Sequence, residues 1–255
     1  MKIEVEEMED KVNMGNSTYE INRVNLICET KSNLFIGGMN ETFEIGGIDM
    51  YTITRDGKPY IPGSSLKGVF RNMFREVYNE CELVEKIFLA YFDEEIKKIN
   101  NVISEIENSN EDIKNKNLLK EKIEKTKKNI ENLKLNIKVE DIFGISGLNN
   151  HPRLIFSDFE IFENDKVDYF SIDAKNTIEY RENEITSIPR IYKTVRKGVK
   201  FSGNISLEKI PKELKNELYD MIINSLNNFN NGNYRIGNSQ SRGYGLVEFT
   251  KGISG

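Results

Sequence analysis

The segment that most constrains how this chain folds reads Ile61-Pro-Gly-Ser-Ser-Leu-Lys-Gly-Val-Phe-Arg71. Its Pro-Gly pair predicts a tight turn, and either Ser64 or Ser65 is a suitable N-cap for a helix. Apolar side chains then recur at helical spacing, at Leu66, Val69, Phe70, Met73, Phe74, Val77 and Tyr78. We therefore expect an amphipathic helix that begins here and buries one face.

The start of this helix has the chemistry of an anion site. A helix N-terminus offers free backbone N–H groups and a partial positive charge to a phosphate. Ser64 and Ser65 would add hydroxyl donors, and the bases at four-residue spacing, Lys67, Arg71 and Arg75, form a stripe beside the apolar face. The segment does not match a Walker A loop. From these residues alone, a phosphate site and a capped helix with incidental surface bases are equally good interpretations.

Strand-like sequence lies upstream of the helix. It begins near Tyr19, after a polar extension at residues 1–18, and Asp56-Gly57 between β-forming residues predicts a hairpin. Residues 83–138 then become rich in Lys, Glu, Asn and Ile, with apolar residues at helical spacing. We expect two long helices there, packed as an antiparallel hairpin and inserted into the domain. Both a solvated arm and a partner-binding surface remain open for this insertion.

Downstream of the insertion the chain returns to strands. Residues 152–162 and 199–207 have strand patterns, residues 211–229 an amphipathic helix pattern, and residues 234–249 form a glycine-rich loop that enters a last strand. This order predicts an α+β domain with a ferredoxin-like or RRM-like sheet. Its core would comprise residues 19–82 and 139–255.

The composition excludes several classes of protein. No run of 18 apolar residues is present, which argues against a membrane span and a membrane partner, and the first ten residues lack the apolar core of a secretion signal. The two cysteines, Cys28 and Cys81, are too few for a disulfide scaffold. We expect a reduced, cytoplasmic protein. The single histidine, His151, has a packing or surface role as its simplest interpretation, and a catalytic role stays open.

The charge is unevenly distributed along the chain. The 255 residues carry a net charge of −5, which taken whole argues against nucleic acid. Residues 1–10 and 80–141 are acidic, with net charges of −4 and −3, whereas residues 55–75 and 175–200 each carry +4. Local patches decide phosphate affinity. The two basic segments are therefore candidate contacts for RNA.

Two further segments carry residues suited to RNA. Residues 175–200 interleave bases with Tyr and Ile, as a protruding hairpin that contacts phosphates would, and the bases we single out are Arg181, Arg190, Lys193 and Arg196. Near the C-terminus, Arg242, Gly243 and Tyr244 lie in a glycine-rich loop whose backbone could approach a phosphate. A solvated loop and a plain turn are the alternatives.

Seven pieces of the sequence, taken in order, resemble the RAMP superfamily of CRISPR-associated proteins, and most closely the repeated backbone subunit of type III effector complexes. They are Phe35-Ile-Gly-Gly38, Ile45-Gly-Gly-Ile-Asp49, Tyr60-Ile-Pro-Gly-Ser-Ser-Leu-Lys-Gly68, Ile142-Phe-Gly144, Arg153-Leu-Ile-Phe-Ser-Asp158, Lys175-Asn-Thr-Ile178 and Gly243-Tyr-Gly-Leu-Val-Glu-Phe249. The ordered set is specific, although no single piece is.

The resemblance implies a modified RRM-like sheet with a thumb hairpin and an inserted helical lid. It implies guide RNA and target RNA as partners, together with other effector-complex subunits and stacked copies of the same chain. The guide would read the target by base pairing while the protein holds the backbone. In this view the basic segments of the chain are RNA contacts.

The resemblance also implies a cutting residue. The family's Asp after the second Gly pair, which supports metal-dependent cleavage of target RNA, corresponds to Asp49. Asp49 would then be both the catalytic residue and a ligand of a divalent cation, Mg²⁺ or Mn²⁺. Some relatives bind zinc near the lid, but Cys81 is the only cysteine or histidine near this insertion, so we expect no zinc.

Whether this copy is an enzyme stays open. A non-catalytic RNA-binding scaffold would have the same architecture. A guide-processing ribonuclease would need a histidine as general base, for which only His151 is present. A stand-alone RRM is disfavoured because the aromatic string of its RNA-binding strand is missing.

Overall fold

The computed structural model describes residues 22–37, 48–108, 113–162, 168–181 and 184–252. Its main sheet is antiparallel throughout and has the strand order β10–β1–β9–β5, with the short β6 also paired to β9. The strands are β1 (Arg23–Thr30), β5 (Arg153–Phe156), β6 (Glu160–Ile161), β9 (Lys200–Glu208) and β10 (Val247–Lys251). In chain order these are β1, a helix, β5, β9, a helix and β10, which is the ferredoxin-like arrangement. The predicted α+β class is confirmed.

The two helices that follow β1 and β9 build the core against the sheet. They are α1 (Gly63–Val77) and α4 (Lys215–Ser225), which is preceded by the turn η2 (Lys212–Leu214) and followed by α5 (Asn227–Asn230). The predicted apolar face of α1 is the buried one, except that Val77 is exposed. Phe70 lies at the centre of an aromatic cluster, with ring centroids 4.9 Å from Phe229, 5.3 Å from Phe156 and 6.0 Å from Phe249.

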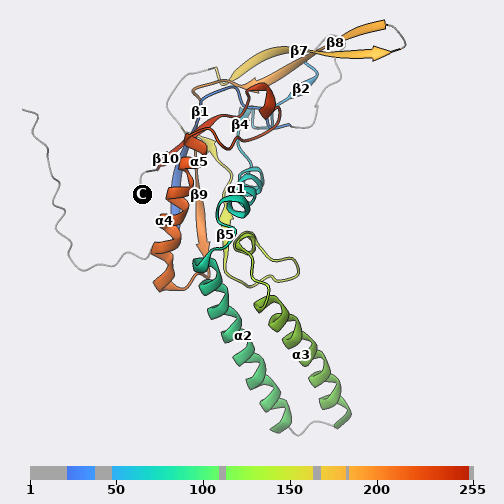
Figure 1. Cartoon of the computed structure of the whole chain (residues 1–255), viewed down its shortest axis with the longest axis vertical. Helices are drawn as coiled ribbons and strands as arrows, with labels where there is room; N and C mark the ends of the chain where they lie inside the picture. Colours follow the sequence, from blue (N-terminus) through green and yellow to red (C-terminus); the bar gives the residue numbers. More distant parts are fainter. Residues whose placement is uncertain (1–21, 38–47, 109–112, 163–167, 182–183, 253–255) are drawn as a thin grey trace, which may run out of the picture.

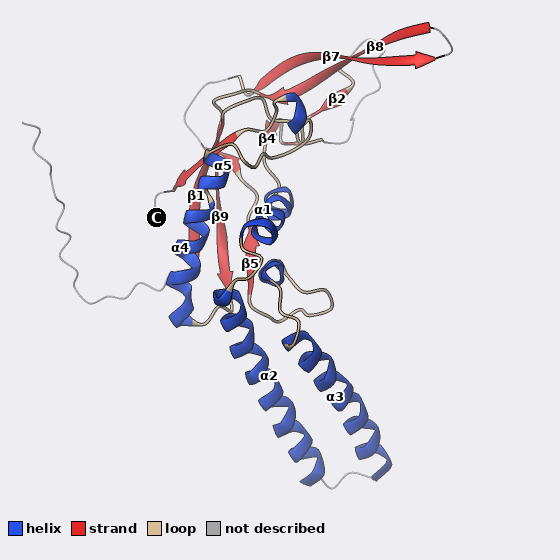
Figure 2. Cartoon of the chain, viewed as in Figure 1, coloured by secondary structure: helices blue, strands red, loops and turns tan. Residues whose placement is uncertain are grey.

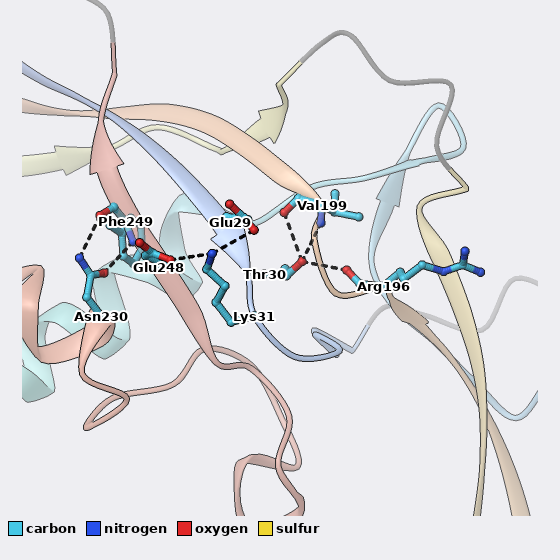
Figure 3. Close-up of polar contacts among 8 residues, drawn as sticks. All are labelled: Glu29, Thr30, Lys31, Arg196, Val199, Asn230, Glu248 and Phe249. Atoms are coloured by element: carbon cyan, nitrogen blue, oxygen red, sulfur yellow. Dashed lines mark hydrogen bonds and ion pairs between the residues drawn. The ribbon is translucent and has the colours of Figure 1, made fainter. Parts of the chain in front are cut away.

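Polar side chains form hydrogen bonds with the backbone of neighbouring segments near the end of β1 (Figure 3). The hydroxyl of Thr30 donates to the carbonyl of Arg196 at 2.8 Å and accepts the Val199 N–H at 2.9 Å. At the outer edge, the Asn230 amide donates to the carbonyl of Phe249 at 3.0 Å and accepts its N–H at 2.7 Å. The Asn230 amide thus takes the place of a neighbouring strand at the outer edge of β10, while β1 pairs with the inner edge.

A long β-hairpin extends from one end of the molecule (Figure 1). It consists of β7 (Phe170–Arg181) and β8 (Glu184–Val195), and β2 (Met50–Tyr51) runs parallel to β8. The hairpin predicted at Asp56-Gly57 is also present, between β3 (Thr54–Arg55) and β4 (Lys58–Pro59). Asp56 and Gly57 have φ values of 51° and 74°, as a tight hairpin turn of this kind requires.

A helical arm extends from the opposite end (Figure 2). It consists of α2 (Glu82–Asn108) and α3 (Ile113–Lys134), and the turn η1 (Val139–Phe143) returns the chain to the core. Lys120 pairs with Glu107 at 2.7 Å, and Lys134 pairs with Asp93, so the two helices lie side by side along the arm. The two long helices predicted from the sequence are confirmed.

In the described part of the chain, no helix combines the length and the apolar character needed to cross a membrane.

Candidate nucleic-acid interface

The N-terminus of α1 already carries an anion from the same chain. The Asp158 carboxylate accepts the Gly63 N–H at 2.8 Å, and it also pairs with Arg55 at 2.6 Å. The Gly63 N–H and then Arg55 lower the pKa of Asp158. Contrary to the sequence prediction, neither Ser64 nor Ser65 is the N-cap, because the helix is capped at Pro62 and both serines lie in its first turn.

The bases of α1 lie beside the η1 turn. Lys67 is half-buried near Gly144, while Arg71 and Arg75 are exposed, as is Ser64. Burial raises the pKa of Asp141 in η1, and the positive charge of Arg71 opposes that rise. Arg75 donates a hydrogen bond to the Asn72 side chain at 2.9 Å. The predicted stripe of bases is thus present on the surface. Any anion bound there would be held by these side chains and not by the backbone N–H groups at the start of the helix.

The lone histidine is a buried packing residue of the loop after η1. The Nε2 atom of His151 accepts the Ile145 N–H at 3.2 Å, and Nδ1 lies 2.7 Å from the carbonyl of Pro152, to which it must donate. Burial lowers its pKa and favours the neutral ring. Both ring nitrogens are occupied and the side chain is inaccessible. The guide-processing alternative therefore loses its general base, and a surface position for His151 is wrong.

At the other end of the molecule, four segments meet in what we call the junction: residues 31–37, β2, the base of the β7–β8 hairpin, and the glycine-rich loop at residues 234–246. Gly245 N–H donates to the Asn33 carbonyl at 2.9 Å, and Leu34 N–H donates to the Val195 carbonyl at 2.9 Å. Gly245 has a φ of 76°, and a Cβ there would lie 1.9 Å from the Ile236 carbonyl oxygen. Only glycine fits this close approach.

Asp173 on β7 is the polar centre of the junction. Its carboxylate accepts the Tyr244 hydroxyl at 2.7 Å, and it also accepts hydrogen bonds from the side chains of Asn33, Ser171 and Thr194. Burial pushes its pKa up, but the four donated hydrogen bonds outweigh burial and lower the pKa below its usual value. For Tyr244, burial and then Asp173 raise the pKa. The glycine-rich loop is therefore tied to the hairpin by a charged hydrogen bond.

The ammonium of Lys175, two residues further along β7, lies between two aromatic rings. Its Nζ is 3.7 Å from the ring centroid of Tyr244 and 4.4 Å from that of Tyr192. The atom is buried and has no hydrogen-bond partner within the described part of the chain. Burial and then the charge of Arg242 lower the pKa of Lys175, against the influence of Asp173.

The bases predicted to contact RNA do not all share the face of this cluster: Arg190 lies opposite Lys175 in the hairpin register, whereas Lys193 lies opposite Ile172 and so on the other face. Arg190 and Arg242 are exposed, Lys193 lies 4.2 Å from the Phe170 ring centroid, and Arg196 pairs with Asp168 at 3.1 Å. Gly243 is exposed with a φ of 90°, and no atom lies within 4 Å of the position that a Cβ would take. Arg181 ends β7, but its side chain lies outside the described residues. The structure thus brings the hairpin and the glycine-rich loop together at one surface.

Asp49 belongs to the same junction and is exposed. Its carboxylate Oδ2 accepts the Ile191 N–H at 2.6 Å, and its own N–H donates to the Ile191 carbonyl at 2.9 Å. Within the described ranges, no group of three acidic, histidine or cysteine side chains is placed to hold a metal ion. Asp49 therefore supplies a single carboxylate that belongs to no such group among these residues.

Sequence reasoning missed the residues that join the junction, namely Asn33, Asp173, Lys175, Tyr192 and Thr194. A signal was present, because Asp173 and Lys175 alternate on one face of a strand. The sequence does not reveal that Tyr192 lies opposite Asp173 or that Tyr244, far along the chain, covers this face.

The family model of the RAMP superfamily matches residues 27–248. One similar solved structure is the crystal structure of Cmr6 from Pyrococcus furiosus, 18% identical with a TM-score of 0.40, covering 89% of this chain and 97% of that chain. Another is a chain of the type III-B Cmr-beta cryo-EM structure of the apo state, 13% identical with a TM-score of 0.45, covering 91% and 98%.

No curated protein matches the sequence. The family match spans most of the chain and includes all four segments of the junction. The chain belongs to the RAMP superfamily.

Proposed function

We propose that the protein is an RNA-holding backbone subunit of a type III CRISPR effector complex, with the junction as its main contact to guide RNA. The observation that carries this proposal is that a long basic hairpin and a glycine-rich loop, each a weak signal alone, are fastened into one surface. Family membership and the ordered motifs of the sequence support it. Target RNA, other subunits and stacked copies of the chain would be its partners.

Within this proposal each extension has a part. The β7–β8 hairpin would be the thumb that contacts and distorts the guide–target duplex, and the α2–α3 arm would be the lid. Residues 19–82 and 139–255 would form the core and residues 83–138 the insertion. The bases of α1, Lys67, Arg71 and Arg75, with Ser64 and Ser65, would add a second and weaker contact to phosphates.

The sheet itself favours the junction over an RRM-type mode of binding. The face of β1 and β9 turned away from the core presents Asn25, Ser202, Asn204 and Ser206. The same face also carries Arg23, Ile27, Glu29, Lys200 and Glu208. None of these side chains is aromatic, whereas an RRM stacks bases on aromatic rings of its sheet. RNA would therefore be held by backbone contacts at the junction.

The test of RNA holding is a binding titration. We expect the purified chain to bind single-stranded RNA of mixed sequence with little sequence preference. Affinity should fall steeply as salt rises, because phosphate contacts release counterions. Fluorescence anisotropy at several salt concentrations measures both. A chain that is folded but binds no RNA at low salt would contradict the proposal.

We further propose that Asp49 serves cleavage of target RNA. Its carboxylate is exposed beside the hairpin base. A divalent cation held there, Mg²⁺ or Mn²⁺, would take its remaining ligands from RNA phosphates and water, as Mg²⁺ commonly does. Asp49 would orient that cation through the oxygen not bound to Ile191.

The scaffold alternative has an observation of its own. The hydrogen bond from Ile191 N–H to Asp49 gives this side chain a structural use without any chemistry. Asp49→Asn keeps an oxygen acceptor for Ile191 but removes the negative charge, so it separates the two roles.

In the reconstituted complex we expect Asp49→Asn and Asp49→Ala to assemble and bind target RNA. We also expect both variants to lose cleavage by about a hundredfold or more, as removal of a transition-state contact does. Denaturing gels of labelled target RNA measure the loss. Cleavage that persists in both variants would leave the scaffold function standing.

A further inference from the structure

Lys175 is an unusual feature for a charged residue. Its ammonium nitrogen is buried between the rings of Tyr192 and Tyr244, and it has no hydrogen-bond partner among the described residues. An ammonium group that loses water without gaining hydrogen bonds is destabilising. Two ring faces at 3.7 and 4.4 Å offset part of that cost through cation–π attraction.

The neighbouring carboxylate is not free to pair with Lys175. Asp173 already accepts four side-chain hydrogen bonds, the shortest of them at 2.7 Å from the Tyr244 hydroxyl. Tyr244 is consequently held at two points. Its hydroxyl is bound to Asp173 and its ring face lies on Lys175, both of which project from the same face of β7.

Tyr244 in turn sets the position of the residues around it. Gly243 before it has free space where a Cβ would lie, although its carbonyl accepts a hydrogen bond from Arg235 at 3.1 Å, whereas Gly245 after it is fixed against Ile236. The loop is also held to the segment after β1, where the Asn238 N–H donates to the Phe35 carbonyl at 2.7 Å, and Tyr244 links it to the hairpin. Arg242, which is exposed, is placed through this link.

We propose that Lys175 is a positioning residue: its ammonium clamps Tyr244 of the glycine-rich loop to Tyr192 of β8 and so fixes the geometry in which Arg242 and the loop backbone meet RNA. This inference rests on the proposed RNA-holding function. Lys175 itself stays covered by the two rings and touches no phosphate.

The test compares Lys175→Met with Lys175→Arg in the full chain. Methionine keeps an unbranched apolar stem and removes the charge, while arginine keeps a cation that stacks on aromatic rings. Two measurements are made on each folded variant. One is hydrogen exchange of the amides at residues 240–246 without RNA, and the other is RNA affinity as a function of salt.

We expect Lys175→Met to speed exchange in the loop and to weaken RNA binding about tenfold, with the salt slope unchanged because no phosphate contact is removed. Lys175→Arg should keep loop exchange nearly as slow, and RNA binding nearly as tight, as in the wild type. Wild-type exchange and affinity in a folded Lys175→Met variant would overturn the clamp. A salt slope reduced by about one together with unchanged loop exchange would also overturn it, because Lys175 would then be a direct phosphate ligand and not a clamp.

A second pair of variants covers the case in which Lys175→Met does not fold. Tyr244→Phe keeps the ring over Lys175 and removes the hydrogen bond to Asp173, whereas Tyr244→Leu removes both contacts. The clamp predicts faster loop exchange in Tyr244→Leu than in Tyr244→Phe, and equal exchange would overturn it. If the wild-type chain binds no RNA, the proposed function fails. The hydrogen exchange of the loop amides would still show whether Lys175 clamps Tyr244.

Discussion

The start of α1 and the junction are both candidate anion sites, and they differ in what the fold supplies. At α1 the chain provides its own anion, because Asp158 accepts the first free N–H of the helix. At the junction the Asp173 carboxylate is saturated by neutral donors and the Lys175 ammonium is covered by two aromatic rings, while Arg242 is exposed to an incoming anion. A sequence motif indicates where anions can bind, and the remaining fold decides whether the position is taken.

The largest difference between the two regions should appear in RNA affinity. Arg242→Glu places a negative charge, which repels RNA phosphates, beside the loop backbone. We therefore expect RNA binding to weaken by about 2 kcal/mol, or a factor of about 30, as for the loss of a charged hydrogen bond. Arg71→Glu on the α1 stripe is the matched control, with a loss of less than about threefold. Anisotropy at one fixed salt concentration measures both. Equal losses would remove the distinction drawn between the two sites.

The capping carboxylate of α1 provides the second test. Asp158→Ala should lower the free energy of unfolding by about 1 kcal/mol, the usual cost of losing a helix cap. Ser64→Ala is the control and should change stability little, because Ser64 is exposed and is not the cap. Urea denaturation measures both variants.

The same variant tests whether the N-terminus of α1 can bind an added anion once the Asp158 carboxylate is removed. Once Asp158 is removed, the Gly63 N–H is free, and added sulfate should stabilise Asp158→Ala more than the wild type. Equal stabilisation of the two proteins by sulfate would show that the helix end does not bind anions even when it is open.

The smallest effect concerns His151, beside the α1 stripe. Burial lowers its pKa in the folded state, so the unfolded chain binds more protons below about pH 6.5. Its contribution to stability is fully present above that pH and is lost as pH falls below it. The charges of Arg153 and Lys67 also lower the pKa of His151, while the charge of Asp141 raises it.

The measurement is the pH dependence of unfolding free energy between pH 7.5 and about pH 5, for wild type and His151→Gln. The difference between the two curves isolates the histidine from nearby carboxylates such as Asp141, whose raised pKa contributes with the opposite sign. Parallel curves would mean that His151 does not titrate on unfolding in this range.

Local patterns predicted the secondary structure well where short-range physics decides it. The apolar spacing of α1, the Asp56-Gly57 turn and the two arm helices are all set by neighbouring residues. The cap of α1 could not be predicted, because Asp158 lies 95 residues away from Gly63 in the sequence.

The candidate site shows the same limit. The bases of the hairpin and the loop are readable from composition, but their joining depends on Asp173 and Tyr244, which are 71 residues apart. His151 was readable as a non-catalytic residue, yet its burial comes from the fold of the loop after η1. Pairings of this kind become visible only when the strand register is known.

The amide of Asn230 has a consequence for assembly. It occupies the N–H and the carbonyl of Phe249, which are the groups that an incoming strand would need to extend the sheet beyond β10. An open sheet edge is a template for uncontrolled polymerisation, and a side chain that mimics a neighbouring strand closes it. The copies that we propose to line up along an RNA would therefore not join by a continuous sheet through Phe249.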